Sequence, residues 1–96
     1  MLYAQSVKKS ELEMAEFLEA LKAPQSRRII EKLATKEMDL DNLIKNTKLS
    51  VQSIQLHLKP LIKAKLVSKS KDGLFKVNWA KFNRNADWFK SISDSK

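Results

Sequence analysis

The sequence predicts a mainly α-helical winged helix-turn-helix domain with the element order helix, helix, helix, helix, hairpin, helix. One Gly and two Pro in 96 residues favour long helices with few loops. Apolar residues recur at helical spacing through the first four segments, and an Asp-Gly turn between two β-prone runs then predicts a hairpin. We expect one domain over residues 1–96, in which residues 1–9 form an N-terminal arm or extend the first helix.

Composition narrows the class of protein before any motif is considered. Hydrophobic residues make up 43% of the chain, which excludes a disordered protein, and no apolar run is long enough to span a membrane. Cysteine is absent, which excludes disulfides, thiolate metal sites and thiol redox sensing. No secretory signal is recognisable, so we expect a cytoplasmic protein. The net charge of +8 favours a polyanionic partner: DNA, RNA or an acidic membrane surface.

The first helix is predicted from a capping box over residues 10–13, in which Ser10 bonds a first-turn N–H and Glu13 reaches back to the cap. Apolar residues then recur at helical spacing, at Leu12, Ala15, Leu18 and Leu21. Pro24 opens the second helix, because Pro is tolerated at the first helical position, and this helix runs to about Ala34.

Two further helices are expected to form the helix-turn-helix. Asp39 is the predicted cap of a short third helix, from Leu40 to about Thr47, with Leu40, Leu43 and Ile44 directed inward. Ser50 is the predicted cap of a fourth helix that ends near Ala64 or Lys65. A short helix joined by a three-residue turn, 47–49, to a longer helix with polar outward residues is typical of this motif.

The fourth helix is predicted to have two chemically different faces. At about 100° per residue, Ile54, Leu58 and Leu61 fall in one narrow sector and form the core face. The opposite side carries Gln52, Leu56, Lys59 and Lys63, flanked by Ser53 and Gln55. Amides can bond a base edge at two points, a leucine suits a thymine methyl and lysines reach phosphates, so Gln52, Ser53, Gln55 and Leu56 are the candidate base readers. The alternative is a surface helix with ordinary solvated side chains.

The hairpin after this helix is predicted to be a basic wing. The strand-like segments 66–70 and 74–78 flank Lys71-Asp72-Gly73, and a tight turn requires positive φ at its central residues. Candidate phosphate contacts are Ser50, Lys59, Lys63, Lys69, Lys71 and Lys76. The alternative for each strand lysine is an exposed residue that blocks edge-to-edge aggregation.

The last helix is predicted to begin after an Asn78 cap and to cover residues 79–93. Its apolar stripe consists of Trp79, Phe82, Ala86, Phe89 and Ile92, and Trp88 lies off the stripe. Small domains bury little surface, so we expect a homodimer of C2 symmetry joined by this stripe and by Leu12, Leu18 and Leu21 of the first helix. The alternative is that the stripe covers only its own core.

From Leu21 to about Phe82 the sequence resembles the arsenic-repressor (ArsR) family of winged-helix repressors. The pattern Pro-x-x-Arg-Arg-Ile-Leu-Glu of that family matches residues 24–31, and its Leu-Ser-x-x-x-Val-x-x-His-Leu-Lys-x-Leu segment matches residues 49–61. Leu66-Val67 and Asp72-Gly73 match its strand start and wing turn. The resemblance implies a homodimer, paired through its first and last helices, that represses transcription by occupying a palindromic operator.

The chain departs from the metal-sensing members of that family. Segment 37–43 is similar to their metal box, but Asp39 and Asp41 stand at both sulfur positions. Carboxylates do not replace thiolates for arsenite, lead or cadmium, so we interpret Asp39 as a helix cap and Asp41 as a first-turn acid. His57 is the only histidine, which is too few for a zinc site within one chain, and it is expected to pack at the core edge or to bond a backbone group. We expect no metal and no cofactor.

Two backbone positions also depart from the family pattern. Pro60 deletes the helical bond to the Leu56 carbonyl, so the fourth helix is expected either to kink there or to compensate through packing. Lys65 stands where the family usually has Gly. A left-handed conformation costs a non-Gly residue about 1 kcal/mol, which favours a reshaped turn.

These observations predict a sequence-specific DNA-binding transcriptional regulator, a dimeric repressor that is not regulated by a thiol-ligated metal. A winged-helix protein-interaction module, with Trp88 at the contact, and a non-specific nucleic-acid architectural protein remain as alternatives. A protein or small-molecule effector is also left open. The sequence has no Gly-rich phosphate loop and no His–acid–nucleophile set, so an enzyme is not expected.

Overall fold

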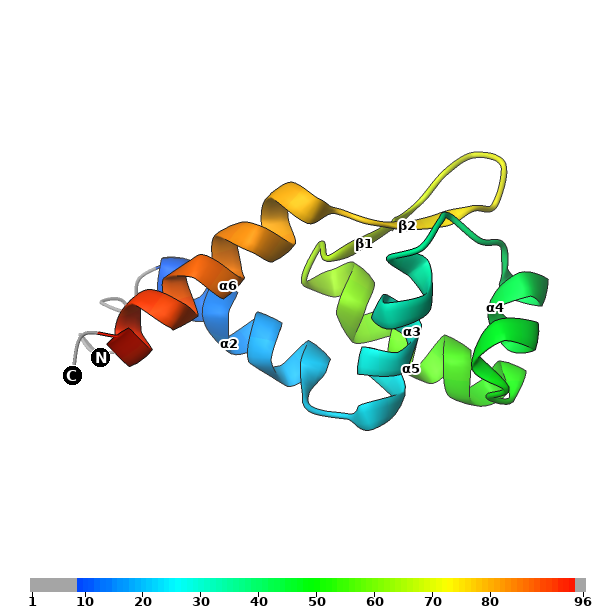
Figure 1. The fold of residues 1–96 in the computed structure, drawn as a ribbon, viewed down its shortest axis with the longest axis horizontal. Coiled ribbons are helices and arrows are strands. Elements are labelled where there is room, and N and C mark those ends of the chain that lie inside the picture. The colour runs from blue at the N-terminus through cyan, green and yellow to red at the C-terminus, as the bar shows by residue number, and fades with distance from the viewer. Residues whose placement is uncertain (1–8, 95–96) are drawn as a thin grey trace, which may run out of the picture.

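The computed structural model describes residues 9–94 and confirms the predicted order of elements (Figure 1). The helices are α2 (Lys9–Leu21), α3 (Pro24–Leu33), α4 (Leu40–Thr47), α5 (Val51–Lys63) and α6 (Trp79–Asp94), and the strands are β1 (Val67–Lys69) and β2 (Phe75–Val77). The predicted winged helix-turn-helix class is therefore confirmed. Residues 1–8, which make up most of the segment 1–9 expected as an arm or a helix extension, and the side chains of Trp88, Phe89 and Ile92 lie outside the described part. None of the helices in that part is long and apolar enough to cross a membrane.

The two halves of the molecule carry different elements (Figure 1). The helices α2 and α6 pack against each other in one half, and α4 and the hairpin tip lie at the other end. Helix α3 lies between them and contacts α2, α4, α5 and β2. Ile29, Leu43, Ile54 and Leu61, from three different helices, are completely buried where these elements meet. This core fixes α5 against α3 and leaves one long face of α5 free.

The predicted helix starts at Asp39, Ser50 and Asn78 are confirmed. The Asp39 carboxylate accepts the Asn42 N–H at 2.9 Å, and the Ser50 hydroxyl accepts the Ser53 N–H at 3.1 Å. The Asn78 side-chain oxygen accepts the backbone N–H of Lys81 at 3.2 Å. Each cap satisfies a first-turn donor that the helix itself cannot pair.

The predicted capping box at the start of α2 is wrong. Ser10 lies within the helix, which already includes Lys9. The Glu13 carboxylate bonds the side chains of Arg84 and Asn85 on α6. Glu13, which the local pattern assigned to the helix cap, thus forms a tertiary contact with α6.

The wing turn differs in detail from the expectation. The strands pair antiparallel with Val67 opposite Val77, and the Gly73 N–H donates to the Ser70 carbonyl at 3.0 Å to close the turn. Gly73 has φ +83°, whereas Asp72 is not among the positive-φ residues. The expected positive φ at the central residues of the turn is therefore wrong. The turn is instead one in which a glycine in the left-handed conformation, Gly73, follows the two central residues. Met38 adds a further pairing on the outer side of β2, bonding Phe75 through both backbone groups, at 3.1 and 2.7 Å.

The expected reshaping at Lys65 is also wrong. Lys65 keeps the left-handed conformation with φ +62°, its N–H donates to Ile62, and the Leu66 N–H donates to Leu61, each at 2.9 Å. These two bonds are the Schellman pattern that ends helices at a glycine. Pro60, five residues earlier, does not end α5, which continues to Lys63.

The strain at Lys65 leads to a testable expectation. Lys65→Gly should raise the free energy of unfolding by up to about 1 kcal/mol, because glycine adopts a left-handed φ without a Cβ clash. Urea denaturation of the two proteins measures the change. The control is Lys63→Gly in the last turn of α5, which should lower the same quantity by about 1 kcal/mol. A loss of stability in both variants would contradict the strain at Lys65.

Candidate nucleic-acid interface

Helix α5 presents the two faces that its sequence predicts. Ile54, Leu58 and Leu61 are at most 4% exposed and form part of the core. The opposite face is open to solvent and carries Gln52, Gln55, Leu56, Lys59 and Lys63. Leu56 is 63% exposed, although the core is immediately behind the helix. Leu56 therefore contributes much less to the core than Leu58 and Leu61 on the opposite face.

Ser53 and His57 are more constrained than the rest of the predicted reading face. Ser53 is half-buried, and its hydroxyl lies 3.4 Å from Nδ1 of His57. The same Nδ1 lies 2.7 Å from the Ser53 carbonyl oxygen, and since a carbonyl only accepts, Nδ1 carries the proton. The expectation that His57 bonds a backbone group is confirmed. Among the predicted base readers, Ser53 therefore has the least freedom to reach outward.

The wing places its lysines on different sides. Lys71 is exposed at the turn, next to Asp72. Lys69 is opposite Phe75 in the pairing, and its ammonium lies 5.6 Å from the centre of that ring. Lys76, next along β2, points to the other face of the hairpin because side chains alternate along a strand. The structure thus brings Lys69 toward the α5 side of the wing, directs Lys76 away from it and leaves Lys71 exposed at the turn.

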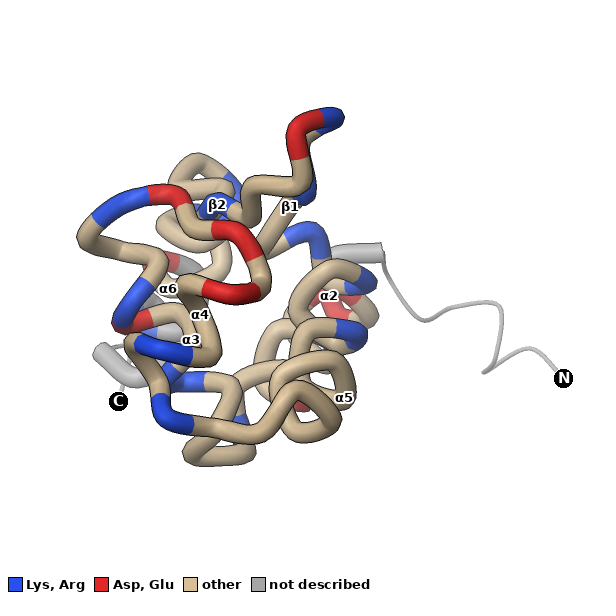
Figure 2. The backbone as a smooth tube through the Cα atoms, turned by 90° about the vertical axis from the view of Figure 1, so that its right-hand side faces the viewer, with Lys and Arg blue, Asp and Glu red and all other residues tan. Residues whose placement is uncertain are grey.

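A groove of about 300 Å³ separates α5 from the wing. It is lined by Gln55 and Leu58 of α5, by Lys69, Asp72, Gly73 and Phe75 of the hairpin, and by Asp39, Leu40 and Asp41 before and in α4. Figure 2 shows acidic positions among basic ones on this side of the molecule. Three carboxylates against one ammonium make the groove unfavourable for a phosphate. The surface suited to a polyanion is therefore the outer face of α5 together with the wing tip.

These carboxylates do not form a metal centre. Within residues 9–94 no group of three or more His, Cys, Asp or Glu side chains could hold a metal ion. Asp39 is engaged as a helix cap, which confirms its structural interpretation, and Asp41 lies in the positive first turn of α4.

Sequence reasoning missed the contacts that hold the helix-turn-helix together. The Nε of Arg28 on α3 donates to the Thr47 carbonyl at 2.7 Å, and Thr47 is 1% exposed. The Thr47 hydroxyl donates to the Leu43 carbonyl at 2.7 Å and accepts the Leu49 N–H at 3.2 Å. The available signal was a threonine at the end of a short helix, where a hydroxyl can bond the preceding turn.

Those residues of the predicted dimer interface whose side chains the structure describes lie in the other half of the molecule and fall into two groups. Leu12, Leu18 and Trp79 are large apolar side chains that are 45–56% exposed. Leu21, Phe82 and Ala86 are half-buried and pack against the protein's own core. Phe82 makes edge-to-face contacts with Phe17 of α2 and with Trp79, each with ring centres 5.6 Å apart.

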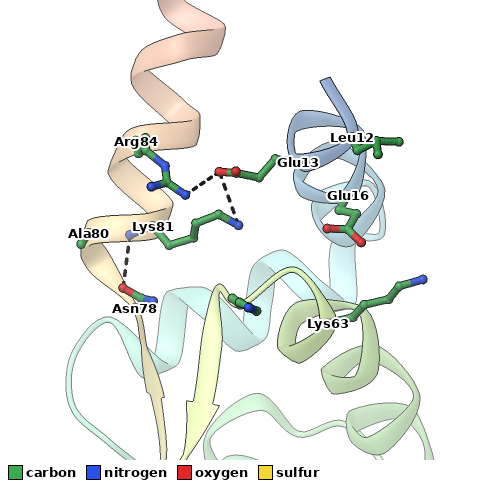
Figure 3. Close-up of a pocket in the computed structure, with 9 residues that line it drawn as sticks. Leu12, Glu13, Glu16, Lys63, Asn78, Ala80, Lys81 and Arg84 are labelled. Carbon is green, nitrogen blue, oxygen red and sulfur yellow. Dashed lines mark hydrogen bonds and ion pairs between the residues drawn. The ribbon is translucent and has the colours of Figure 1, made fainter. Parts of the chain in front are cut away.

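A cleft of about 560 Å³ lies between α2, the end of α5 and the start of α6 (Figure 3). Glu13 reaches across it from α2 and meets three side chains of α6: Arg84 at 2.6 Å, Asn85 at 3.2 Å and Lys81 at 3.7 Å. Lys81 also donates to the Ala64 carbonyl at 2.7 Å. The hydrogen bond from Arg84 is the main cause that holds the pKa of Glu13 below its usual value, against the opposing effect of burial.

This network gives α2–α6 packing a pH dependence. Because its pKa is lowered in the folded state, Glu13 stabilises the fold above the ordinary glutamate pKa, and this contribution is lost as the pH falls below it. Glu13→Gln should lower the free energy of unfolding by about 1–3 kcal/mol at pH 7, since hydrogen bonds to a charged group are lost. The difference from the unaltered protein should shrink below about pH 4. Urea denaturation at both pH values measures it, with Glu16→Gln on the same helix as control. An equal loss in both variants would contradict the role of Glu13.

Comparison with known proteins agrees with this architecture. No protein-family model matches the chain, and no curated protein matches it. Among solved structures it is similar to an ArsR-like transcriptional regulator from Rhodococcus sp. RHA1, at a TM-score of 0.79 and 24% identity, over 88% of this chain and 82% of that chain. At this identity the likeness establishes the fold alone, a winged helix-turn-helix.

Proposed function

We propose that this chain is a sequence-specific DNA-binding transcriptional regulator that acts as a homodimeric repressor on a palindromic operator. The observation that carries the proposal is the exposed face of α5, where Gln52, Leu56, Lys59 and Lys63 stand opposite a buried core face. Amides and an exposed leucine suit base edges and thymine methyls in a major groove, and lysines suit phosphates. The similarity to a structure described as a transcriptional regulator supports the same function.

Each group of residues receives a role in this proposal. Gln52, Gln55 and Leu56 read bases, with Ser53 at the edge of the reading face. Lys59 and Lys63 on α5 and Lys69 and Lys71 in the wing bind phosphates, and Ser50 and Lys76 are secondary phosphate contacts. The four exposed lysines lie on α5 and the wing, the two elements that this proposal places against DNA.

The proposed dimer joins two copies through the exposed residues of α2 and α6. Leu12, Leu18 and Trp79 would become buried in the interface. Sedimentation at tens of micromolar should show a dimer, and Leu18→Glu should shift it to monomer because a buried carboxylate without a partner is costly. Leu56→Glu, at a leucine that is also exposed but lies on α5, is the control. A monomer at this concentration in the unaltered protein would contradict the dimer.

Selection of bound duplexes from a random pool, followed by footprinting of the selected sequence, tests the function. The expected result is a palindromic site bound at least about a thousandfold more tightly than scrambled DNA. Equal affinity for selected and random duplexes would instead indicate an architectural nucleic-acid protein. A partner retained after nuclease treatment, with no DNA affinity, would indicate a protein-interaction module. Without cysteine, operator affinity should not respond to arsenite, cadmium or zinc at stoichiometric concentrations.

A further inference from the structure

The end of α4 is tied to α3 by a side chain that lies outside the proposed reading face. Arg28 donates through Nε to the Thr47 carbonyl at 2.7 Å, across nineteen positions of the chain. This carbonyl belongs to the last residue of α4, where helical carbonyls have no partner within their own helix. A guanidinium there also complements the negative end of the helix dipole. The contact therefore fixes the end of α4, and not merely its core face, against α3.

The turn that follows is hydrogen-bonded through Lys48, Leu49 and Ser50. The Lys48 N–H donates to Ile44 at 2.9 Å, with Lys48 in a left-handed conformation at φ +61°. The next N–H, of Leu49, donates to the hydroxyl of Thr47, which is buried and itself donates to Leu43. Ser50 then caps α5. Thr47 is thus bonded through its carbonyl to α3, and through its hydroxyl to both α4 and the turn.

This chain of bonds leads directly to the reading face. Gln52 lies five residues after Thr47, in the first turn of α5. Helix α3 packs against both α4 and α5, so it is the common frame from which the start of α5 is positioned. A bidentate contact between an amide and a base edge depends on direction, and side chains must be held within about 0.5 Å for such geometry. A small rotation at the turn would displace Gln52 while leaving the buried residues of α5 in the core.

We propose that Arg28 and Thr47 are positioning residues for sequence recognition. Their hydrogen bonds fix residues 47–49, the turn between α4 and α5, so that the side chains at the start of α5 point at the base edges. This inference rests on the proposed DNA-binding function. It assigns no DNA contact to either residue. Loss of these hydrogen bonds should therefore reduce discrimination between DNA sequences, whereas affinity for scrambled DNA should be unaffected.

Arg27 supplies a matched control. It is the neighbouring arginine on α3 and also donates to backbone carbonyls at a helix end, but to Leu21 and Lys22 after α2, at 2.8 and 3.0 Å. Arg28→Met and Arg27→Met remove the same charge from the same helix. We expect Arg28→Met to lower the ratio of selected to scrambled affinity by about tenfold, the effect of removing one base contact. Arg27→Met should leave this ratio unchanged. The two variants should have the same affinity for scrambled DNA and the same salt dependence of binding.

Thr47→Val tests the hydroxyl contacts of Thr47 with a side chain of the same shape. It removes both hydroxyl bonds and should also lower the ratio of selected to scrambled affinity, with the loss concentrated at the base pair that Gln52 reads. Arg28→Lys keeps a donor and the charge, so it should recover part of the ratio. Thermal denaturation of every variant separates this effect from unfolding, and Arg28→Lys keeps the test valid if Arg28→Met does not fold.

The outcomes distinguish this inference from the function on which it rests. If Arg28→Met and Arg27→Met reduce the ratio equally, or if Arg28→Met weakens scrambled and selected DNA alike, the positioning role is wrong. If the unaltered protein shows no difference between selected and scrambled DNA, the proposed function itself fails.

Discussion

Raising the salt concentration from about 50 mM to about 200 mM should weaken operator binding by about a thousandfold to a hundred-thousandfold. This range corresponds to about six to ten phosphates bound by a dimer, each of which releases a condensed counterion. The motivation is the set of exposed lysines on α5 and at the wing, Lys59, Lys63, Lys69 and Lys71, in a chain of net charge +8. Binding isotherms across a salt series measure the slope of log affinity against log salt.

Lys71→Ala tests where this charge acts. The variant should weaken binding to all sequences alike and lower the slope by about one unit for each phosphate that the dimer no longer binds. Lys90→Ala on α6 removes the same charge from the half of the molecule away from the wing and should leave the slope unchanged. A slope near zero in the unaltered protein, or equal changes in the two variants, would contradict the proposed DNA surface.

The features that could be predicted from sequence are those that neighbouring residues decide. Asp39, Ser50 and Asn78 cap their helices as expected, because a cap needs only a side-chain oxygen and an N–H three residues later. The buried and exposed faces of α5 were predictable for the same reason, since helical periodicity alone separates Ile54 from Gln52 and Leu56. The order of elements follows from these local signals together with the Asp-Gly turn.

The features that could not be predicted depend on contacts between distant segments. Glu13 has the right spacing for a capping box, but its carboxylate is drawn to Arg84, seventy-one positions away. Asn85 stands within the last helix beside the predicted apolar stripe, yet it is 4% exposed and bonds Glu13, and its Oδ1 has no hydrogen-bond partner in the part of the chain that the structure describes. Lys65 keeps the backbone conformation that glycine favours because two helix-ending hydrogen bonds offset the strain. No pattern along the chain contains these pairings.

The candidate site shows the same division. Sequence identifies the exposed residues of α5, but not the carboxylates of Asp39, Asp41 and Asp72 that line the groove beside it. It also groups Lys76 with Lys69, although alternation along the paired strands directs them to opposite faces. Counting lysines therefore overstates the positive charge beside α5, because three carboxylates line the groove that Lys69 shares and Lys76 lies on the opposite face of the hairpin.

Gln52→Ala and Gln55→Ala should each remove a base contact worth about 1–3 kcal/mol per half-site and relax the preference at one operator position in each half-site. Gln52 lies on the outer face of α5, and Gln55 lies on its wing side, at the edge of the acidic groove. The two amides therefore approach different base pairs, and the relaxed positions should differ. Neither substitution changes the charge, so the salt slope should stay as in the unaltered protein.

The measurement compares affinities for the operator, for each of its single-base variants and for scrambled DNA. Asn83→Ala provides the control, because it removes an exposed amide from α6 in the other half of the molecule. Since the rest of α5 stays fixed by Ile54, Leu58 and Leu61 in the core, a selective effect at one position reports the removal of a base contact and not a displaced helix. If Gln52→Ala and Gln55→Ala leave the operator-to-scrambled ratio unchanged, α5 does not read bases.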